Sequence, residues 1–135
     1  MEKLVLSHNN LNELPRSLDK LKKLKTLEQQ KLWQNNQIKE YYLEISEILR
    51  TYLEGRYQVN AMESTTDEII EDLNNTDVNK NLNSKLKDVL QQCDLAKFAK
   101  FKPSPEENTR LMKSAQDFVL HTKPKPVIEE PKNKA

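Results

Sequence analysis

A single glycine, Gly55, occurs in this chain of 135 residues, and this scarcity limits the folds that the chain can adopt. Folds rich in β-strands use glycine at many of their tight turns. Phosphate-binding loops also need glycine, because only glycine lets the backbone approach a ligand closely in strained conformations. We therefore expect an all-α protein, and we expect no glycine-rich phosphate loop.

The composition fits one helical domain with a small core. Hydrophobic residues make up 36% of the chain and charged residues 32%, so the core has to come from few, well-placed side chains. The 22 basic and 21 acidic residues give a net charge of +1, without the basic excess typical of nucleic-acid-binding domains. The lone cysteine, Cys93, excludes an internal disulfide bond and suits a reducing compartment.

Apolar residues recur every three or four positions over much of the chain, which is the spacing of one helix face. The pattern predicts helices over 35–54, 65–75, 82–101 and 104–120. Asn35 or Asn36 separates the first of these from a preceding helix, and a break near Cys93–Asp94 interrupts the third. We expect a compact bundle of about five to six helices, with an irregular N-terminal lead-in and a disordered C-terminal tail.

Residues typical of helix ends support these boundaries. Thr65 with Glu68, and Ser104 with Glu107, have the three-residue spacing of a capping box, and Pro105 suits a first helical position. Gly55 stands just after the helix predicted over 35–54, where a left-handed cap is commonly needed, and we expect it to end that helix.

The stretch LVLSHNNLNELPRSL, residues 4–18, resembles one leucine-rich repeat. The following residues do not continue the pattern, and one repeat cannot bury its own leucines. Two interpretations remain. Either residues 1–27 are a repeat-derived binding segment, or 16–33 is the first helix of a domain over 16–121 and 1–15 is its lead-in. The last segment, 122–135, has three prolines and many charges, which predicts a disordered tail.

Two longer stretches resemble the cytoplasmic helical domain of BatD-like bacterial proteins. They cover 31–73 and 90–119 in the right order. The shared features are Leu32-Trp33, KEYY at 39–42, ILR at 48–50, YLE at 52–54, TTDEI at 65–69, DLAKFAK at 94–100 and PSP at 103–105.

This resemblance implies a domain that normally follows a membrane span on the cytoplasmic side. Such proteins are typically encoded beside MoxR-type ATPases and von Willebrand factor A-domain proteins, in clusters linked to aerotolerance or envelope stress. Here a repeat-like segment stands where the span is expected. The resemblance therefore implies a non-enzymatic protein–protein interaction module of a Bat-type membrane-associated complex. We expect a cytoplasmic chain without a membrane span, or a position at the inner face of the inner membrane within a parent protein or complex.

The residue types that carry catalysis or bind metals do not converge in the sequence. His8 and His121 lie at opposite ends, and Cys93 has no sequence partner, so we expect no catalytic, cofactor or metal site and a buried, apolar role for Cys93. Four acidic residues lie near the start of one helix: Asp67, Glu68, Glu71 and Asp72. Capping and the helix dipole explain that position.

Lysines alternate with aromatic residues in LAKFAKFKPSP, residues 95–105. This pattern can bind single-stranded nucleic acid, but Leu95, Phe98 and Phe101 also share an approximate helix face, which predicts core contacts. A basic rim for a protein partner is the third interpretation, and the core is the one we favour for the aromatic residues. The candidate interaction surface comprises Lys97, Lys100, Lys102, Arg50, Arg56 and Tyr57.

Overall fold

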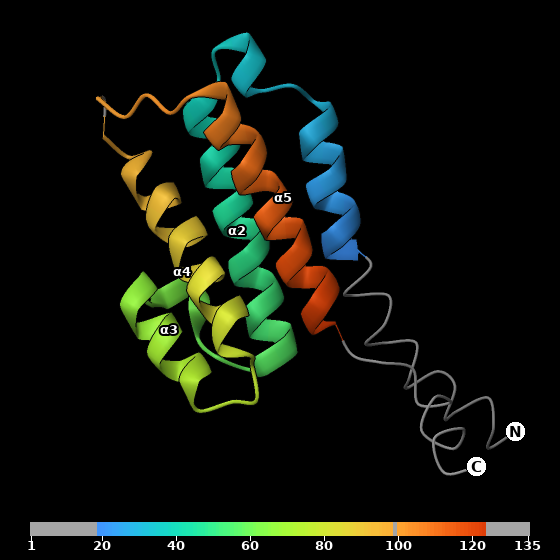
Figure 1. Ribbon diagram of the computed structural model, residues 1–135, viewed down its shortest axis with the longest axis vertical. Helices are drawn as coiled ribbons and strands as arrows, with labels where there is room; N and C mark the ends of the chain where they lie inside the picture. Colours follow the sequence, from blue (N-terminus) through green and yellow to red (C-terminus); the bar gives the residue numbers. More distant parts are fainter. Residues whose placement is uncertain (1–18, 99, 124–135) are drawn as a thin grey trace, which may run out of the picture.

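The computed structural model describes residues 19–98 and 100–123, and within these ranges all regular structure is helical (Figure 1). An α-helix over 19–29 comes first. It is followed by η1 (Trp33–Asn35), α2 (Ile38–Tyr57), η2 (Ala61–Glu63), α3 (Thr66–Asn74), α4 (Lys80–Leu95) and α5 (Pro105–Thr122). Five α-helices without a strand in the described ranges confirm the prediction of a compact all-α bundle.

The long helices pack around α2. Helices α2 and α5 run in the same direction, since Tyr41 near the start of α2 bonds to Asn108 and Tyr52 near its end bonds to Thr122. Helix α4 runs the opposite way and packs on both, while the short α3 folds back along α4 (Figure 1). The helix over 19–29 lies on the other side of the bundle, where Gln116 of α5 bonds to Glu28.

The core comes from one face of each helix. Helix α2 contributes Tyr41, Tyr42, Ile45, Ile48, Leu49, Tyr52 and Leu53. Helix α5 contributes Leu111, Met112, Ala115, Phe118 and Val119, and α4 contributes Leu86, Val89, Leu90 and Cys93. The buried positions recur every three or four residues, which places them on a single side of each helix.

Both predicted capping boxes are confirmed. The Glu68 amide donates to Thr65 Oγ1 over 3.2 Å, and the Thr65 amide donates to Glu68 Oε1 over 2.8 Å. Ser104 and Glu107 make the same pair of bonds, at 3.1 Å and 2.8 Å. At the starts of α3 and α5, residues three positions apart therefore bond each other's amide groups without help from distant parts of the chain.

The prediction that Gly55 ends α2 is wrong. The helix continues through Tyr57, and the left-handed residue at its end is Gln58, with φ of 60°. Gly55 does not have a positive φ, so it sits in an ordinary helical turn. The run of apolar residues used to predict α2 ended at Leu53, whereas the helix continues for one more turn to Tyr57. The break before α2 is confirmed at Asn36, with φ of 66°.

The prediction that Leu95 and Phe98 belong to the core is also wrong, since both side chains are exposed, Phe98 by 65%. Helix α4 ends at Leu95, two residues beyond the expected break, and the amides of Ala96, Lys97 and Phe98 close tight turns onto the residues three before them. Leu95 lies two residues after the buried Cys93, which places it on the opposite side of α4, and Phe98 follows the turns in which the regular helix has ended. Phe101 is half-buried against the core.

The predictions for the two ends of the chain fall partly outside the described residues. The lead-in over 1–15 lies wholly outside them, and the tail over 122–135 does so from residue 124 onward. Thr122 itself is buried in α5, one residue beyond the expected end of the domain. The described part of the 1–27 segment is helical, and its Leu24 and Leu27 are buried in the core.

Among the helices of 19–98 and 100–123, none has the length and apolar character needed to cross a membrane.

Candidate functional site

An open groove of about 510 Å³ lies between α2, the segment 61–66 and the end of α4. We call it the Arg50 groove. It is lined by Leu43, Ser46, Arg50, Met62, Glu63, Ser64, Thr65, Thr66, Cys93, Asp94 and Lys97. Three separate segments of the chain thus meet here, and polar side chains join them.

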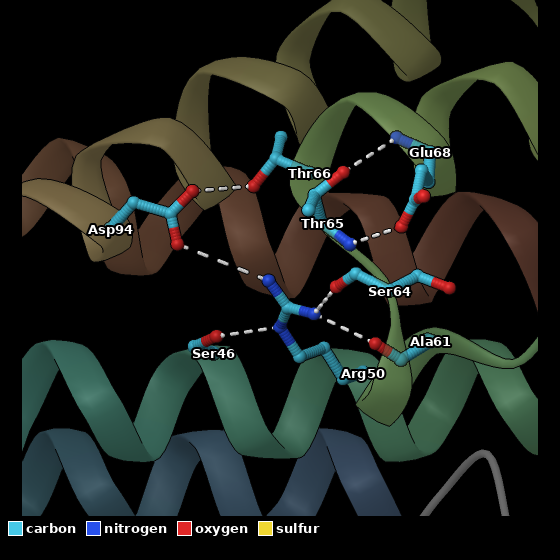
Figure 2. A network of polar contacts seen from close by, with 8 residues as sticks. All are labelled: Ser46, Arg50, Ala61, Ser64, Thr65, Thr66, Glu68 and Asp94. Atoms are coloured by element: carbon cyan, nitrogen blue, oxygen red, sulfur yellow. Dashed lines mark hydrogen bonds and ion pairs between the residues drawn. The ribbon is translucent and has the colours of Figure 1, made fainter.

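The Arg50 guanidinium group binds the segment 61–66 to α2 (Figure 2). Its Nη1 donates to the carbonyl oxygens of Ala61 and Ser64, both over 2.7 Å. Its Nε donates to Ser46 Oγ, one turn earlier on α2, over 3.1 Å. A planar group with five donors suits this divergent arrangement, which a lysine could not reproduce.

Asp94 connects the same arginine to α4 (Figure 2). Arg50 Nη2 lies 3.9 Å from Asp94 Oδ1, and the hydroxyl of Thr66 donates to Asp94 Oδ2 over 2.7 Å. The Arg50 side chain is only 13% exposed, whereas Asp94 is 41% exposed. The arginine is therefore engaged within the domain, and its main effect is to hold the walls of the groove in place.

Cys93 lies at the edge of this groove, with its side chain buried. Burial raises the pKa of the Cys93 thiol to about 12, and the negative charge of Asp94 contributes in the same direction. Because the thiolate is the nucleophilic form, the group is unreactive near neutral pH. The burial expected for Cys93 is confirmed. In the described part of the chain, no three His, Cys, Asp or Glu side chains are grouped to hold a metal ion.

A second, smaller depression of about 210 Å³ adjoins the Arg50 groove, and we call it the Phe98 hollow. It is lined by Ile38, Lys39, Ala96, Lys97, Phe98 and Phe101. Phe101 packs edge-on against Tyr42, with the ring centroids 5.1 Å apart, and so anchors the floor to the core. Lys97 lines both depressions, so the two share one wall residue.

Exposed apolar side chains gather on this face. The described residues include five large hydrophobic side chains with high exposure: Leu43, Met62, Leu95, Phe98 and Leu120. Leu43 and Met62 line the Arg50 groove, and Phe98 lines the Phe98 hollow. We refer to the groove and the hollow together as the α2–α4 face. The sequence analysis missed Phe98 as an exposed residue, because Leu95, Phe98 and Phe101 have the spacing of one helix face.

The structure brings together only part of the candidate interaction surface. Lys97 lines both depressions of the α2–α4 face and Arg50 lines the Arg50 groove, while Lys100 and Lys102, the sequence neighbours of Phe101, are exposed. The other two residues lie elsewhere, in the last turn of α2: Arg56 and Tyr57.

The Arg56–Tyr57 pair packs against the end of α5. Arg56 Nε donates to the Thr122 carbonyl over 2.7 Å, and its Cζ stands 4.6 Å from the centre of the Tyr57 ring. Burial raises the pKa of the Tyr57 hydroxyl. These contacts close the far end of the bundle and leave Arg56 bound within the domain.

Comparison with known proteins found no match to this chain among family models, curated proteins or solved structures. The resemblances to BatD-like domains and to a leucine-rich repeat therefore stay predictions.

Proposed function

We propose that this helical domain is a non-enzymatic protein–protein interaction module that binds its partner through the α2–α4 face. The observation that carries the proposal is the grouping of Leu43, Met62 and Phe98 around two adjoining depressions. Scattered exposed apolar residues are normal on a protein surface, but apolar groups around a concave, polar-rimmed surface are typical of binding sites.

The frame of the face supports binding by a rigid surface. Arg50 fixes the segment that carries Met62, and the Thr65–Glu68 capping box fixes the next residues. Ordering flexible loops is a main cost of association, so walls that are already held in place favour affinity.

The polar groups of the face suit binding better than catalysis. Asp94 is engaged with Arg50 and Thr66, and the raised pKa of Cys93 keeps its thiol protonated. The histidine of the described ranges, His121, lies on α5, where its Nδ1 is 2.8 Å from the Asp117 carbonyl oxygen. These positions support a role without covalent chemistry.

The proposed cellular setting is a cytoplasmic Bat-type complex, at the inner face of the membrane. Its support is the sequence resemblance over 31–73 and 90–119. Those stretches contain Leu43, Met62 and Phe98, so the segments that resemble the family also supply the apolar groups of the face. The partner proposed on this basis is a MoxR-type ATPase or a von Willebrand factor A-domain protein.

The direct test is to immobilise the full chain and titrate it with the MoxR-type ATPase and the von Willebrand A-domain protein of the same genome. We expect one of them to bind, and Met62→Glu to weaken binding by about tenfold or more because it buries a charge in the contact. Leu120→Glu is the matched control, since Leu120 is similarly exposed but lies on α5.

Two results would contradict separate parts of the proposal. Absence of binding to either protein removes the Bat-type setting. A photoreactive side chain at position 62 or at position 120, used in cells, then tests the module itself. Cross-links to protein from position 120, with none from position 62, would reject the α2–α4 face as the binding surface.

A further inference from the structure

We propose that the Phe98 hollow binds an acidic peptide segment through one apolar anchor residue of that segment. The inference rests on the proposed function as a protein-binding module, and it names the chemistry of the partner at one part of the α2–α4 face. Three features of the hollow support it: its size, its walls and its charge.

The size of the hollow fits one side chain. Its volume of about 210 Å³ is smaller than the roughly 300–1,000 Å³ of pockets that enclose whole small-molecule ligands. Four of its six lining residues are apolar: Ile38, Ala96, Phe98 and Phe101. Such a recess accepts a leucine, isoleucine, methionine or phenylalanine side chain, and burial of that side chain is the main source of affinity at anchor positions.

The charge around the hollow selects the residues beside the anchor. Lys39 and Lys97 line it, and Lys100 and Lys102, which precede and follow Phe101 in the sequence, are exposed. None of these four lysines pairs with a carboxylate among the described residues, and no acidic residue lines the hollow. This positive charge is therefore available to a partner, and aspartate or glutamate residues flanking the anchor complement it.

The same lysines could attract nucleic acid, but the aromatic geometry favours a peptide. Binding of single strands uses several aromatic faces on which successive bases stack. Here only Phe98 is open, because Phe101 is half-buried edge-on against Tyr42 at an interplanar angle of 86°. The nearby arginine, Arg50, is engaged with Ala61, Ser64 and Asp94, so its guanidinium group is not available for two parallel hydrogen bonds to a phosphate.

The test is a selection from a phage-displayed library of random peptides of about 12 residues on the immobilised full chain. The same library is selected on Phe98→Ala, and the two enriched pools are compared by sequencing. We expect the wild-type pool to be enriched in peptides that place an apolar residue among aspartates or glutamates. A representative synthetic peptide should lose about tenfold or more in affinity with Phe98→Ala and with Lys97→Glu/Lys100→Glu.

The control variant is Leu120→Ala. Leu120 is exposed like Phe98 but lies near the end of α5, roughly 22 Å along that helix from Pro105. We expect it to leave peptide affinity unchanged. Phe98→Ala should melt at the wild-type temperature, because the removed side chain is mostly exposed. This check separates lost binding from lost folding.

The outcomes distinguish the two proposals. Enriched peptides that depend on Phe98 but lack acidic residues would overturn the acidic partner and leave the interaction module standing. A pool with no dependence on Phe98 would overturn the hollow as an anchor site, while the Met62→Glu experiment decides the module separately. Binding of a single-stranded oligothymidylate that Phe98→Ala abolishes, in the absence of selected peptides, would assign the hollow to nucleic acid instead.

Discussion

The hydroxyl of Tyr42 donates a 2.6 Å hydrogen bond to the side-chain oxygen of Asn108, which lies 66 residues further along the chain. The neighbouring Tyr41 hydroxyl donates to the backbone carbonyl of the same asparagine over 3.0 Å. All three residues are buried. Two adjacent tyrosines of α2 therefore hold the first turns of α5 in register, beside the ring of Phe101 that closes the Phe98 hollow.

Asn108→Ala is expected to lower the free energy of unfolding by about 1–3 kcal/mol, because it leaves the buried Tyr42 hydroxyl without an acceptor. Tyr42→Phe should cost a similar amount by leaving the asparagine oxygen unpaired. Urea denaturation of both single variants and the double variant measures the coupling. The double variant should cost less than the sum of the single ones. Fully additive costs would mean that this bond does not couple the two helices.

Arg50→Met is expected to lower the free energy of unfolding by about 2–4 kcal/mol. The change removes three hydrogen bonds and leaves the carbonyls of Ala61 and Ser64 without their donor. Hydrogen exchange followed by mass spectrometry should show faster exchange over residues 60–66. Lys97→Met is the control, since Lys97 lines the same groove but is exposed, and it should change stability by less than about 0.5 kcal/mol. Equal effects of the two changes would reject the structural role of Arg50.

Gly55→Ala is expected to stabilise the domain by about 0.5–1 kcal/mol. Gly55 lies inside α2 without a positive φ, and a Cβ added there meets no atom within 4 Å. The added methyl group also lowers the conformational entropy of the unfolded chain. The readout is the midpoint of denaturation. A loss of stability would show instead that Gly55 serves as the cap that the sequence predicted.

Gln58→Gly provides the complementary measurement. Gln58 takes the left-handed conformation at the end of α2, where glycine carries no steric penalty. Glycine removes the steric penalty in the folded state, which stabilises the domain, but it also makes the unfolded chain more flexible, which destabilises the domain. These effects oppose each other, so we expect the free energy of unfolding to change by less than about 0.5 kcal/mol. A large loss would mean that the Gln58 side chain contributes more than the backbone geometry indicates.

The free energy of unfolding is expected to fall as the pH rises above the ordinary thiol pKa of 9.0, because burial raises the pKa of Cys93 to about 12 in the folded domain. In the unfolded chain the thiol ionises first, so the unfolded state binds fewer protons between these values and stability decreases with pH. A single group contributes at most about 1.4 kcal/mol per pH unit. Burial also raises the pKa values of Tyr41 and Tyr42, which extends the same trend to higher pH.

The measurement is guanidinium denaturation at about pH 8 and at about pH 10.5, for the wild type and Cys93→Ala. The variant should lose less stability between the two pH values, whatever its stability at pH 8. In parallel, Ellman's reagent should react with Cys93 of the wild type only after unfolding. Rapid reaction with the folded protein at neutral pH would contradict the burial and the raised pKa.

Locally encoded features of this protein could be predicted from its sequence. The capping boxes at Thr65 and Ser104 need only residues three positions apart, and both are present. The buried stripes of α2 and α5 follow from apolar spacing, and the lack of glycine correctly indicated an all-α fold. These properties depend on residues within one or two helical turns of each other, so they can be predicted from residue spacing along the chain.

Only the tertiary structure decided the candidate site. Phe98 is exposed because α4 ends at Leu95, whereas the spacing of Leu95, Phe98 and Phe101 predicted one buried helix face. Arg50 is bound inward because Asp94 and the carbonyls of Ala61 and Ser64 come within its reach. Contacts of this kind join side chains far apart in sequence, and they exist only once packing has brought their helices together. The sequence therefore determined which segments are helical and where α3 and α5 begin, whereas packing decided the shape and charge of the α2–α4 face.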